Sequence, residues 1–157
     1  MSKVMNITFA GIGGQGVLTA TDVLAAALFN AGFDVKKSEV HGMSQRGGSV
    51  SSEVRYGEKV ASPMIPNGES DFLVVIDETQ VDVNIHKLAP NGVLITPSMV
   101  DANKLANKRS INIALMGLLS TYLDLPLELW ENAIKSEMAE KIHAVNIDAF
   151  ALGRESR

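Results

Sequence analysis

Residues 4–30 read VMNITFAGIGGQGVLTATDVLAAALFN, and this stretch decides the fold. Residues 4–10 form a short apolar run, which is typical of a buried strand. Residues 15–30 are predicted to form a helix, because apolar side chains from Val17 to Leu28 recur at the spacing of one helical face. The glycines of residues 11–16 lie between the two, so the stretch predicts a strand, a tight loop and a helix.

The segments that follow extend this unit. A second strand is predicted over residues 33–39, after Gly32 in a position typical of a helix C-cap. The order strand, glycine loop, helix, strand is that of a βαβ unit. Residues 49–56 alternate between polar and apolar side chains and predict a third strand. Gly57-Glu58 fits a two-residue hairpin turn, so we expect residues 59–62 to return as its antiparallel partner.

Two further strands are predicted in the middle of the chain. They cover residues 72–76 and 93–96, because both runs are continuously apolar. A short helix over residues 79–88 connects them, and Pro90-Asn91-Gly92 is expected to form a turn. Residues 97–108 show no pattern that decides between helix and strand.

Three helices are expected after these strands. The first carries apolar side chains from Ile111 to Tyr122 on one face, the second begins at Pro126, and the third ends at Gly153. Helices and strands together predict an α/β fold, a three-layer α/β/α Rossmann-like domain with a mostly parallel, mixed sheet. The length of 157 residues fits a single domain over residues 1–157.

Composition excludes several classes of protein. The net charge of −4 gives no electrostatic basis for nucleic-acid binding. The chain has no cysteine, so it forms no disulfide and holds no iron–sulfur cluster by its own thiolates. No apolar run approaches the ~18 residues of a membrane span, and the N-terminal residues lack the pattern of a signal peptide. We therefore expect a cytoplasmic protein with no membrane or nucleic-acid partner.

The glycine loop, residues 11–16, satisfies the pattern G-x-G-x-x-G between a predicted strand and a predicted helix. Glycines let the backbone turn tightly and approach a ligand, and the helix N-terminus offers unpaired N–H groups to a phosphate. The same pattern fits a tight turn whose glycines only permit close packing. We predict an anion or phosphate site, and its candidate residues are Gly11, Gly13, Gly14, Gln15 and Gly16.

The glycine pattern alone does not identify the phosphorylated ligand. A dinucleotide site also needs an acidic residue at the end of the second strand, about 20 residues on, and Glu39 fits that position. An NAD(P)-binding Rossmann protein is therefore an alternative. A non-catalytic nucleotide-binding module that regulates a partner is a second alternative, because it would share the glycine loop.

A second polar loop, residues 39–48, reads EVHGMSQRGG. It follows the second predicted strand, so we expect it at the same sheet edge as the glycine loop, where ligands bind in open α/β sheets. The loop is rich in hydrogen-bond donors, and Arg46 can clamp a phosphate or a carboxylate with two hydrogen bonds. A solvated loop in which Arg46 pairs with Glu39 explains the same residues.

Other polar residues give weaker signals. The sequence shows no convincing catalytic triad and no cluster with metal-ligand spacing, so no metal site is assigned. His86 and His143 lie beside charged residues and are interpreted as surface or cap residues. Asp77 ends a predicted strand at the ligand-binding edge, where it could act on a ligand or cap the following helix. Trp130 is expected in the core or at a partner interface.

Several motifs carry a resemblance to a known family. The stretch GIGGQGV at residues 11–17 resembles the opening motif of gamma-type subunits of 2-oxoacid:ferredoxin oxidoreductases. Residues 39–48 resemble the indolepyruvate oxidoreductase beta subunit of that group and are more specific than the glycines. The similarity covers nearly the whole chain, although residues 97–112 look shorter than is usual in the family. Further matches are SPMIP at residues 62–66, Asp71, Asn112, Gly117, Asn146, Ala149, Phe150 and Gly153.

The resemblance implies a subunit of a thiamine-diphosphate-dependent enzyme. Such enzymes decarboxylate a 2-oxoacid such as indolepyruvate oxidatively, pass two electrons to ferredoxin and transfer the acyl group to coenzyme A. A larger partner subunit would hold thiamine diphosphate and the iron–sulfur clusters, and the carbanion chemistry would belong to thiamine. The present chain would contribute to the active site without carrying a redox centre, and it would be inactive alone.

The resemblance also suggests roles for the two loops. Coenzyme A is the expected ligand, bound by the glycine loop together with Gln45, Arg46 and Gly47. His41 and Ser44 are the candidate catalytic residues, because they could hydrogen-bond the acyl intermediate.

Overall fold

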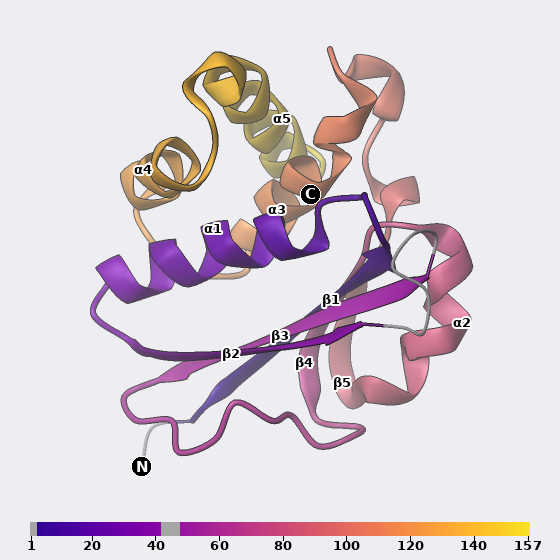
Figure 1. The fold of residues 1–157 in the computed structure, drawn as a ribbon, viewed down its shortest axis with the longest axis vertical. Coiled ribbons are helices and arrows are strands. Elements are labelled where there is room, and N and C mark those ends of the chain that lie inside the picture. Colours follow the sequence, from indigo (N-terminus) through magenta and orange to yellow (C-terminus); the bar gives the residue numbers. More distant parts are fainter. Residues whose placement is uncertain (1–2, 42–47) are drawn as a thin grey trace.

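The computed structural model describes residues 3–41 and 48–157, which form one five-stranded sheet with helices packed on it (Figure 1). The strand order across the sheet is β2-β3-β1-β4-β5. The strands are β1 (Met5–Ile12), β2 (Asp34–His41), β3 (Ser49–Gly57), β4 (Ser70–Val75) and β5 (Leu88–Ile95). The helices are α1 (Val17–Asn30), α2 (Val81–Asn84), α3 (Ile111–Ser120), α4 (Leu127–Glu137) and α5 (His143–Glu155).

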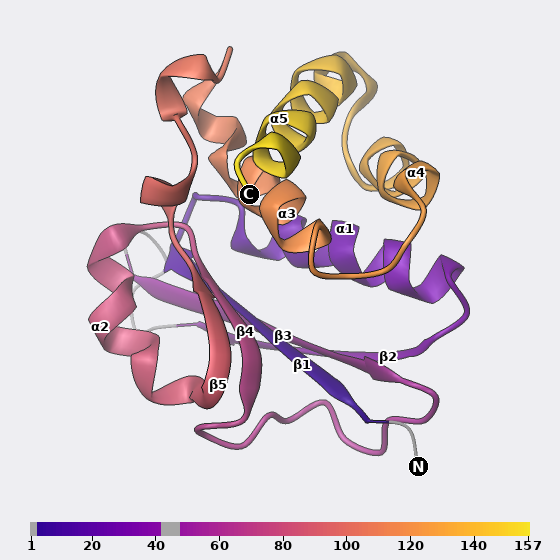
Figure 2. The same ribbon diagram turned by 180° about the vertical axis from the view of Figure 1, so that it is seen from behind.

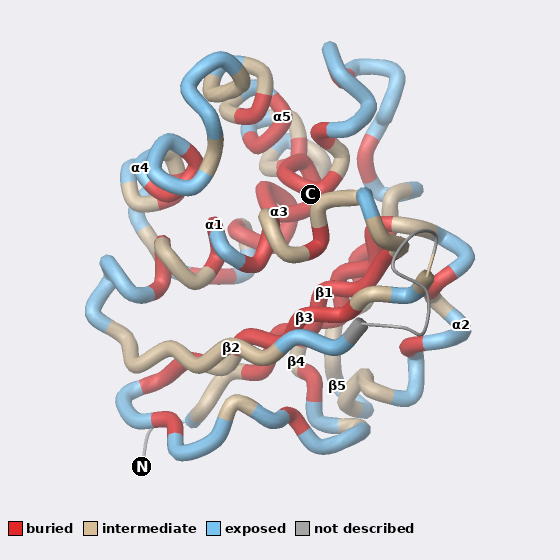
Figure 3. Tube along the Cα trace, in the orientation of Figure 1, coloured by how far each residue is buried: buried red, intermediate tan, exposed pale blue. Residues whose placement is uncertain are grey.

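The sheet is mixed, as predicted. β4 pairs in parallel with β1 and with β5, whereas β3 is antiparallel to both of its neighbours, β1 and β2. Four of the five strands therefore run in the same direction, and their carboxyl ends lie at one edge of the sheet. Figure 3 shows that the most deeply buried part of the sheet runs along the central strands.

The two faces of the sheet are covered unequally. Helices α1, α3, α4 and α5 lie together on one face (Figures 1 and 2), where the Thr21 hydroxyl hydrogen-bonds the Ser52 hydroxyl at 2.8 Å. The opposite face carries α2 with its flanking 3-10 turns, where Ser49 donates to Gln80 at 2.7 Å. Alternate β3 side chains thus face opposite layers, as their spacing predicted. The α/β/α arrangement is confirmed, with a short second helical layer.

The prediction that residues 59–62 form a hairpin with β3 is wrong. Residues 59–62 form no strand, and β3 instead lies between β1 and β2. The Asp34 carboxylate accepts the Val60 N–H at 2.8 Å, and Arg55 donates to the carbonyl oxygens of Ser62 and Met64, both at 2.9 Å. These side chains hold residues 60–64 as a loop. The strands flanking α1 are consequently not neighbours, so the expected simple βαβ unit is also wrong.

The expected turn at residues 90–92 is wrong as well. β5 runs unbroken from Leu88 to Ile95, with a register shift against β4. A proline is tolerated there because β5 is an edge strand, where a missing N–H costs no ladder hydrogen bond. A Cβ on Gly92 would lie 2.8 Å from the Ser70 carbonyl oxygen, so the glycine permits close approach of the two strands.

The three predicted C-terminal helices are confirmed, but the predicted C-terminal end of the last helix is wrong. Gly153 lies inside α5, which continues to Glu155, because the glycine serves helix packing and not termination. A Cβ on Gly153 would collide with the Ala114 carbonyl oxygen of α3, and one on Gly117 would collide with the Phe150 carbonyl oxygen. Trp130 is completely buried, with its ring 5.6 Å from that of Phe150, so it belongs to the core.

No helix within residues 3–41 and 48–157 is both long and apolar enough to cross a membrane.

Candidate functional site

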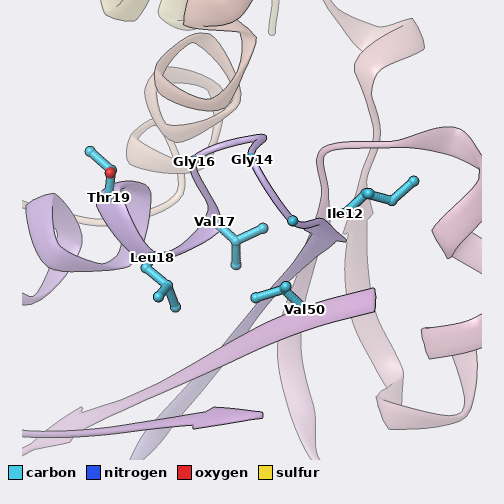
Figure 4. A pocket seen from close by; sticks show the side chains of 8 residues that line it. Ile12, Gly14, Gly16, Val17, Leu18, Thr19 and Val50 are labelled. Atoms are coloured by element: carbon cyan, nitrogen blue, oxygen red, sulfur yellow. The ribbon is translucent and has the colours of Figure 1, made fainter. Parts of the chain in front are cut away.

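The glycine loop joins β1 to the first turn of α1. Gly14 and Gly16 have φ angles of 94° and 78°, in the left-handed region that favours glycine. Gly16 is the N-cap of α1, and the first N–H groups of a helix have no partner within it. A cavity of about 260 Å³ opens over this turn, lined by Gly13, Gly14, Val17, Thr19 and neighbouring residues (Figure 4). The arrangement offers N–H donors and a partial positive charge to an anion.

Gln15 ties the glycine loop to the carboxyl end of β4. Its side-chain oxygen accepts the Ile12 N–H at 2.8 Å, and its amide nitrogen donates to the Asp77 carboxylate at 2.7 Å. Asp77 also accepts the Thr79 hydroxyl at 2.6 Å and the Thr79 N–H at 3.0 Å. The Thr79 hydroxyl, followed by the Gln15 amide and the Thr79 N–H, lowers the pKa of Asp77 below its ordinary value. The predicted helix-capping role of Asp77 is confirmed for the 3-10 turn.

Asn112 explains the third glycine of the pattern. Its side chain is 5% exposed, and its amide nitrogen donates to the Gly16 carbonyl oxygen at 3.1 Å. A Cβ on Gly16 would collide with that amide, so the glycine lets α3 approach the loop. The glycines therefore serve packing and also leave backbone open at the helix N-terminus.

A basic pair that no sequence motif indicated completes the candidate site. Lys108 and Arg109 line a cavity of about 340 Å³ together with Gly14, Gln15 and Asn112. Within the part of the chain that the structure describes, the Arg109 side chain has no hydrogen-bond or ion-pair partner, and Lys108 donates only to the Ala102 carbonyl oxygen at 3.2 Å. Two exposed cations thus stand beside a helix N-terminus, which suits a phosphate.

The two described ends of the second polar loop lie at the same sheet edge as the glycine loop, as predicted. β2 ends at His41, which pairs with Val50, and β3 begins at Ser49 opposite Ile12. The Gly13 N–H donates to the Gly48 carbonyl oxygen at 2.9 Å. Ser44, Gln45, Arg46 and Gly47 lie outside the described residues, as does the side chain of His41. Their predicted roles therefore stay predictions.

The topology argues against the dinucleotide alternative. In a dinucleotide-binding fold the acidic residue ends the strand next to the glycine-loop strand. Here β3 separates β2 from β1, so Glu39 lies two strand spacings, roughly 10 Å, from β1. The exposed Glu39 carboxylate accepts a hydrogen bond from the Lys37 ammonium group, with the two atoms 2.7 Å apart. This geometry keeps Glu39 away from a ribose bound at the glycine loop.

The two histidines outside the second polar loop are a capping residue and a surface residue. The Nε2 atom of His143 lies 2.7 Å from the Met138 carbonyl oxygen, so His143 caps the turn before α5. His86 lies in the 3-10 turn after α2 and is exposed. No group of three or more His, Asp or Glu residues among those described is arranged to hold a metal ion.

Comparison with known protein families decides the relationship of this chain. Residues 6–156 match the family described as pyruvate ferredoxin/flavodoxin oxidoreductase. The chain belongs to this family. It is similar to indolepyruvate oxidoreductase subunit IorB of Archaeoglobus fulgidus, with 32% identity over 188 residues, 95% of this chain and 93% of the relative. The IorB subunit of Thermococcus kodakarensis is 34% identical over 191 residues, 96% of this chain and 95% of that protein.

Solved structures share the fold of this oxidoreductase family member. The gamma subunit of a keto/oxoacid ferredoxin oxidoreductase from Geobacter sulfurreducens superposes with a TM-score of 0.80 at 22% identity, covering 98% of this chain and 96% of that one. A 2-oxoglutarate:ferredoxin oxidoreductase from Magnetococcus marinus, described with 2-oxoglutarate, coenzyme A and succinyl-CoA bound, gives a TM-score of 0.85 at 20% identity. The match covers 98% of this chain and 31% of that longer chain. Both IorB alignments exceed 157 residues, so these relatives contain segments that this chain lacks.

Proposed function

We propose that this chain is the small, cluster-free subunit of a 2-oxoacid:ferredoxin oxidoreductase of the indolepyruvate type. Its family membership and its similarity to IorB subunits over nearly their whole length support this role. The partner is a larger subunit that holds thiamine diphosphate and the iron–sulfur clusters. This chain has no cysteine, so cluster thiolates must come from elsewhere. The cytoplasmic location expected from the sequence is part of the same proposal.

Coenzyme A is the ligand that we assign to the glycine-loop site. The observation that carries this assignment is the convergence of the α1 N-terminus with Lys108 and Arg109 around one cavity. Backbone N–H donors and two cations match the phosphates of coenzyme A in charge and in hydrogen bonding. A structure with the same fold is described with coenzyme A bound, which supports this ligand class. Arg46, from the adjoining loop, supplies a further cation in the proposal.

The residues of this chain bind and orient coenzyme A and the acyl group, whereas the carbanion chemistry belongs to thiamine diphosphate on the partner. In the complete reaction, a 2-oxoacid and the thiol of coenzyme A give an acyl-CoA, carbon dioxide and one proton, and two ferredoxins each accept one electron. Gln15 orders the glycine loop, and the loop with its cations holds the phosphate end of coenzyme A. His41 and Ser44 are proposed to hydrogen-bond the acyl group during its transfer.

The subunit role is tested by reconstitution. The full chain, its larger partner and the mixture are assayed for viologen reduction that depends on indolepyruvate and coenzyme A. We expect turnover only from the mixture, because neither chain alone contains all the groups that the reaction needs. Full activity of either chain alone would overturn the proposed role. Saturable micromolar binding of NADH to this chain, measured by energy transfer from Trp130, would favour the dinucleotide alternative.

A further inference from the structure

The tripeptide Pro-Asn-Gly occurs twice in the chain, at residues 66–68 and at residues 90–92. An asparagine before a glycine can lose its side-chain amide, because the glycine backbone nitrogen attacks the side-chain carbonyl carbon and no Cβ hinders its approach. The reaction needs a backbone that is free to bring these two atoms together. Since the two copies are identical in sequence, the fold decides which of them reacts.

Asn67 and Gly68 form the centre of an open turn. The Glu69 N–H donates to the Pro66 carbonyl oxygen at 3.2 Å, and the φ angle of Gly68 is 79°, as in a type II turn. Asn67 is exposed, and neither its side chain nor the Gly68 N–H has a hydrogen-bond partner among the described residues. Apart from the chain neighbours, no atom lies within 4 Å of the position that a Cβ on Gly68 would take. The attacking nitrogen and its target are therefore both unobstructed.

The second copy of the tripeptide lies within β5. The strand runs through residues 90–92 without a turn. A Cβ on Gly92 would lie 2.8 Å from the Ser70 carbonyl oxygen and 3.1 Å from the Ala89 carbonyl oxygen, so backbone atoms enclose this glycine closely. The Gly92 nitrogen can reach the Asn91 side chain only if β5 separates locally from β4, and such local opening costs free energy.

We propose that Asn67 is a deamidation site of the folded protein and that β5 protects Asn91 from the same reaction. The Gly68 nitrogen forms a bond to Cγ of Asn67, the bond between Cγ and Nδ2 breaks, and ammonia leaves with the proton of the Gly68 nitrogen. Water then opens the cyclic succinimide at either of its carbonyl groups, which gives an aspartate or an isoaspartate. No electrons are transferred, and water is the only co-reactant. This inference is independent of the ligand and of the catalytic role proposed above.

The turn connects this chemistry to the sheet. The Glu69 carbonyl oxygen accepts the Asn6 side-chain amide at 2.9 Å, and the Asp71 carboxylate accepts the Asn6 N–H at 2.9 Å. An isoaspartate at residue 67 adds a methylene group to the main chain, so it disrupts the turn that places Glu69. The new carboxylate also adds negative charge close in sequence to Glu69 and Asp71. We therefore expect deamidation to weaken the junction of β1 with β4.

Peptide mapping of the aged protein tests the proposal. The full chain is kept folded at mildly alkaline pH, and the tryptic peptides 60–87 and 88–104 then report separately on Asn67 and Asn91. We expect Asn67 to convert at least about tenfold faster than Asn91, because the strand must open before Asn91 can react. In guanidinium chloride, where the fold is lost, the two asparagines should convert at similar rates. Equal rates in the folded chain would overturn the proposal, and so would a tenfold difference that persists in guanidinium chloride.

A variant with a longer side chain tests the effect on stability. Asn67→Gln closes the ring much more slowly, whereas Asn91→Gln is the matched control in the second copy of the tripeptide. After ageing, the unaltered chain and Asn91→Gln should both have a lower Tm than before, and Asn67→Gln should keep its initial Tm. If aged Asn67→Gln lost as much stability as the aged unaltered chain, residue 67 would not be the source of the loss and the assigned effect would be wrong.

Discussion

Gln15 and Asp77 show how two side chains can fix a loop that a ligand must approach. Their 2.7 Å hydrogen bond joins the glycine loop to the end of β4, and Thr79 donates twice to the same carboxylate. All three donors favour the ionised form of Asp77, so its pKa is lowered in the folded chain. The loop is therefore preorganised before any ligand arrives.

The lowered pKa of Asp77 gives a pH-dependent prediction. A carboxyl group whose pKa falls on folding stabilises the folded state above its unfolded pKa, near 3.8, and loses that effect as the pH falls through the folded value. Asp77→Asn removes the charge and keeps the side-chain shape. We expect the variant to have a lower Tm than the unaltered chain at pH 7, with the difference shrinking below about pH 4. A Tm difference that is constant from pH 7 to pH 3 would contradict the assigned charge interaction.

Individual residues of the site can be predicted from the sequence only where they are close together in the chain. The glycine pattern predicted the loop and its open backbone, because all its parts fall within residues 11–16. Lys108 and Arg109 were missed, since nothing in their own segment indicates that α3 brings them to a loop more than 90 residues away. One usable signal was Asn107, which accepts the Arg109 N–H at 2.9 Å and so marks a turn before the apolar helix.

Between elements, the contact of α3 with α5 depends on two glycines that face opposite helices. Gly117 and Gly153 each lie against a carbonyl oxygen of the other helix, and backbone atoms cannot move aside as side chains can. The contact matters for the proposed site, because α3 carries Asn112 and follows Lys108 and Arg109. Packing of α5 against α3 therefore helps to position the proposed phosphate site.

A single added methyl group tests the packing of α3 against α5. Gly153→Ala should lower the free energy of unfolding in urea by about 1–3 kcal/mol, although alanine favours a helix, because overpacking forces the helices apart. Ala151→Ser, on the exposed side of α5, serves as the control and should change stability by less than about 0.5 kcal/mol. A Gly153→Ala variant as stable as the unaltered chain would show that the helices are not in close contact there.

Local sequence patterns predicted whether a segment is a helix or a strand better than they predicted which strands pair with each other. Apolar runs and helical spacing located β1, α1, β4 and the three C-terminal helices. The partner of β3 was predicted wrongly, because Gly57-Glu58 fits a hairpin while the true partners are set by long-range pairing with β1 and β2. The end of α5 was wrong for a related reason, since a packing glycine and a capping glycine look alike in one sequence.

At the scale of the whole molecule, the insertion of β3 between β1 and β2 distinguishes this fold from a dinucleotide-binding one. The insertion brings Gly48, which precedes β3, beside the glycine loop, where its carbonyl oxygen accepts a hydrogen bond from the Gly13 N–H. It also moves Glu39 away from the position that a ribose contact needs. The α/β class and the mixed sheet followed from local patterns, but this strand order did not, because the sheet edge on which a strand pairs is decided by the whole domain.

The site faces out of the molecule at one end of the sheet, so a ligand bound there can also reach a second chain. Three adjoining cavities surround the α1 N-terminus, and all of them are open to solvent. This layout fits a subunit that presents one end of coenzyme A while its partner performs the redox chemistry. We therefore propose that the positive charge of Lys108 and Arg109 binds the phosphates of coenzyme A.

The most direct test of that claim is the Michaelis constant for coenzyme A in the reconstituted complex. The double variant Lys108→Ala with Arg109→Ala is compared with Lys104→Ala, which removes an exposed cation outside the site. Loss of charge-assisted hydrogen bonds, each contributing about 1.5–3 kcal/mol, should raise the constant at least tenfold in the double variant. The Lys104→Ala complex should keep the value of the unaltered one. A correctly assembled double-variant complex with an unchanged Michaelis constant for coenzyme A would contradict the account.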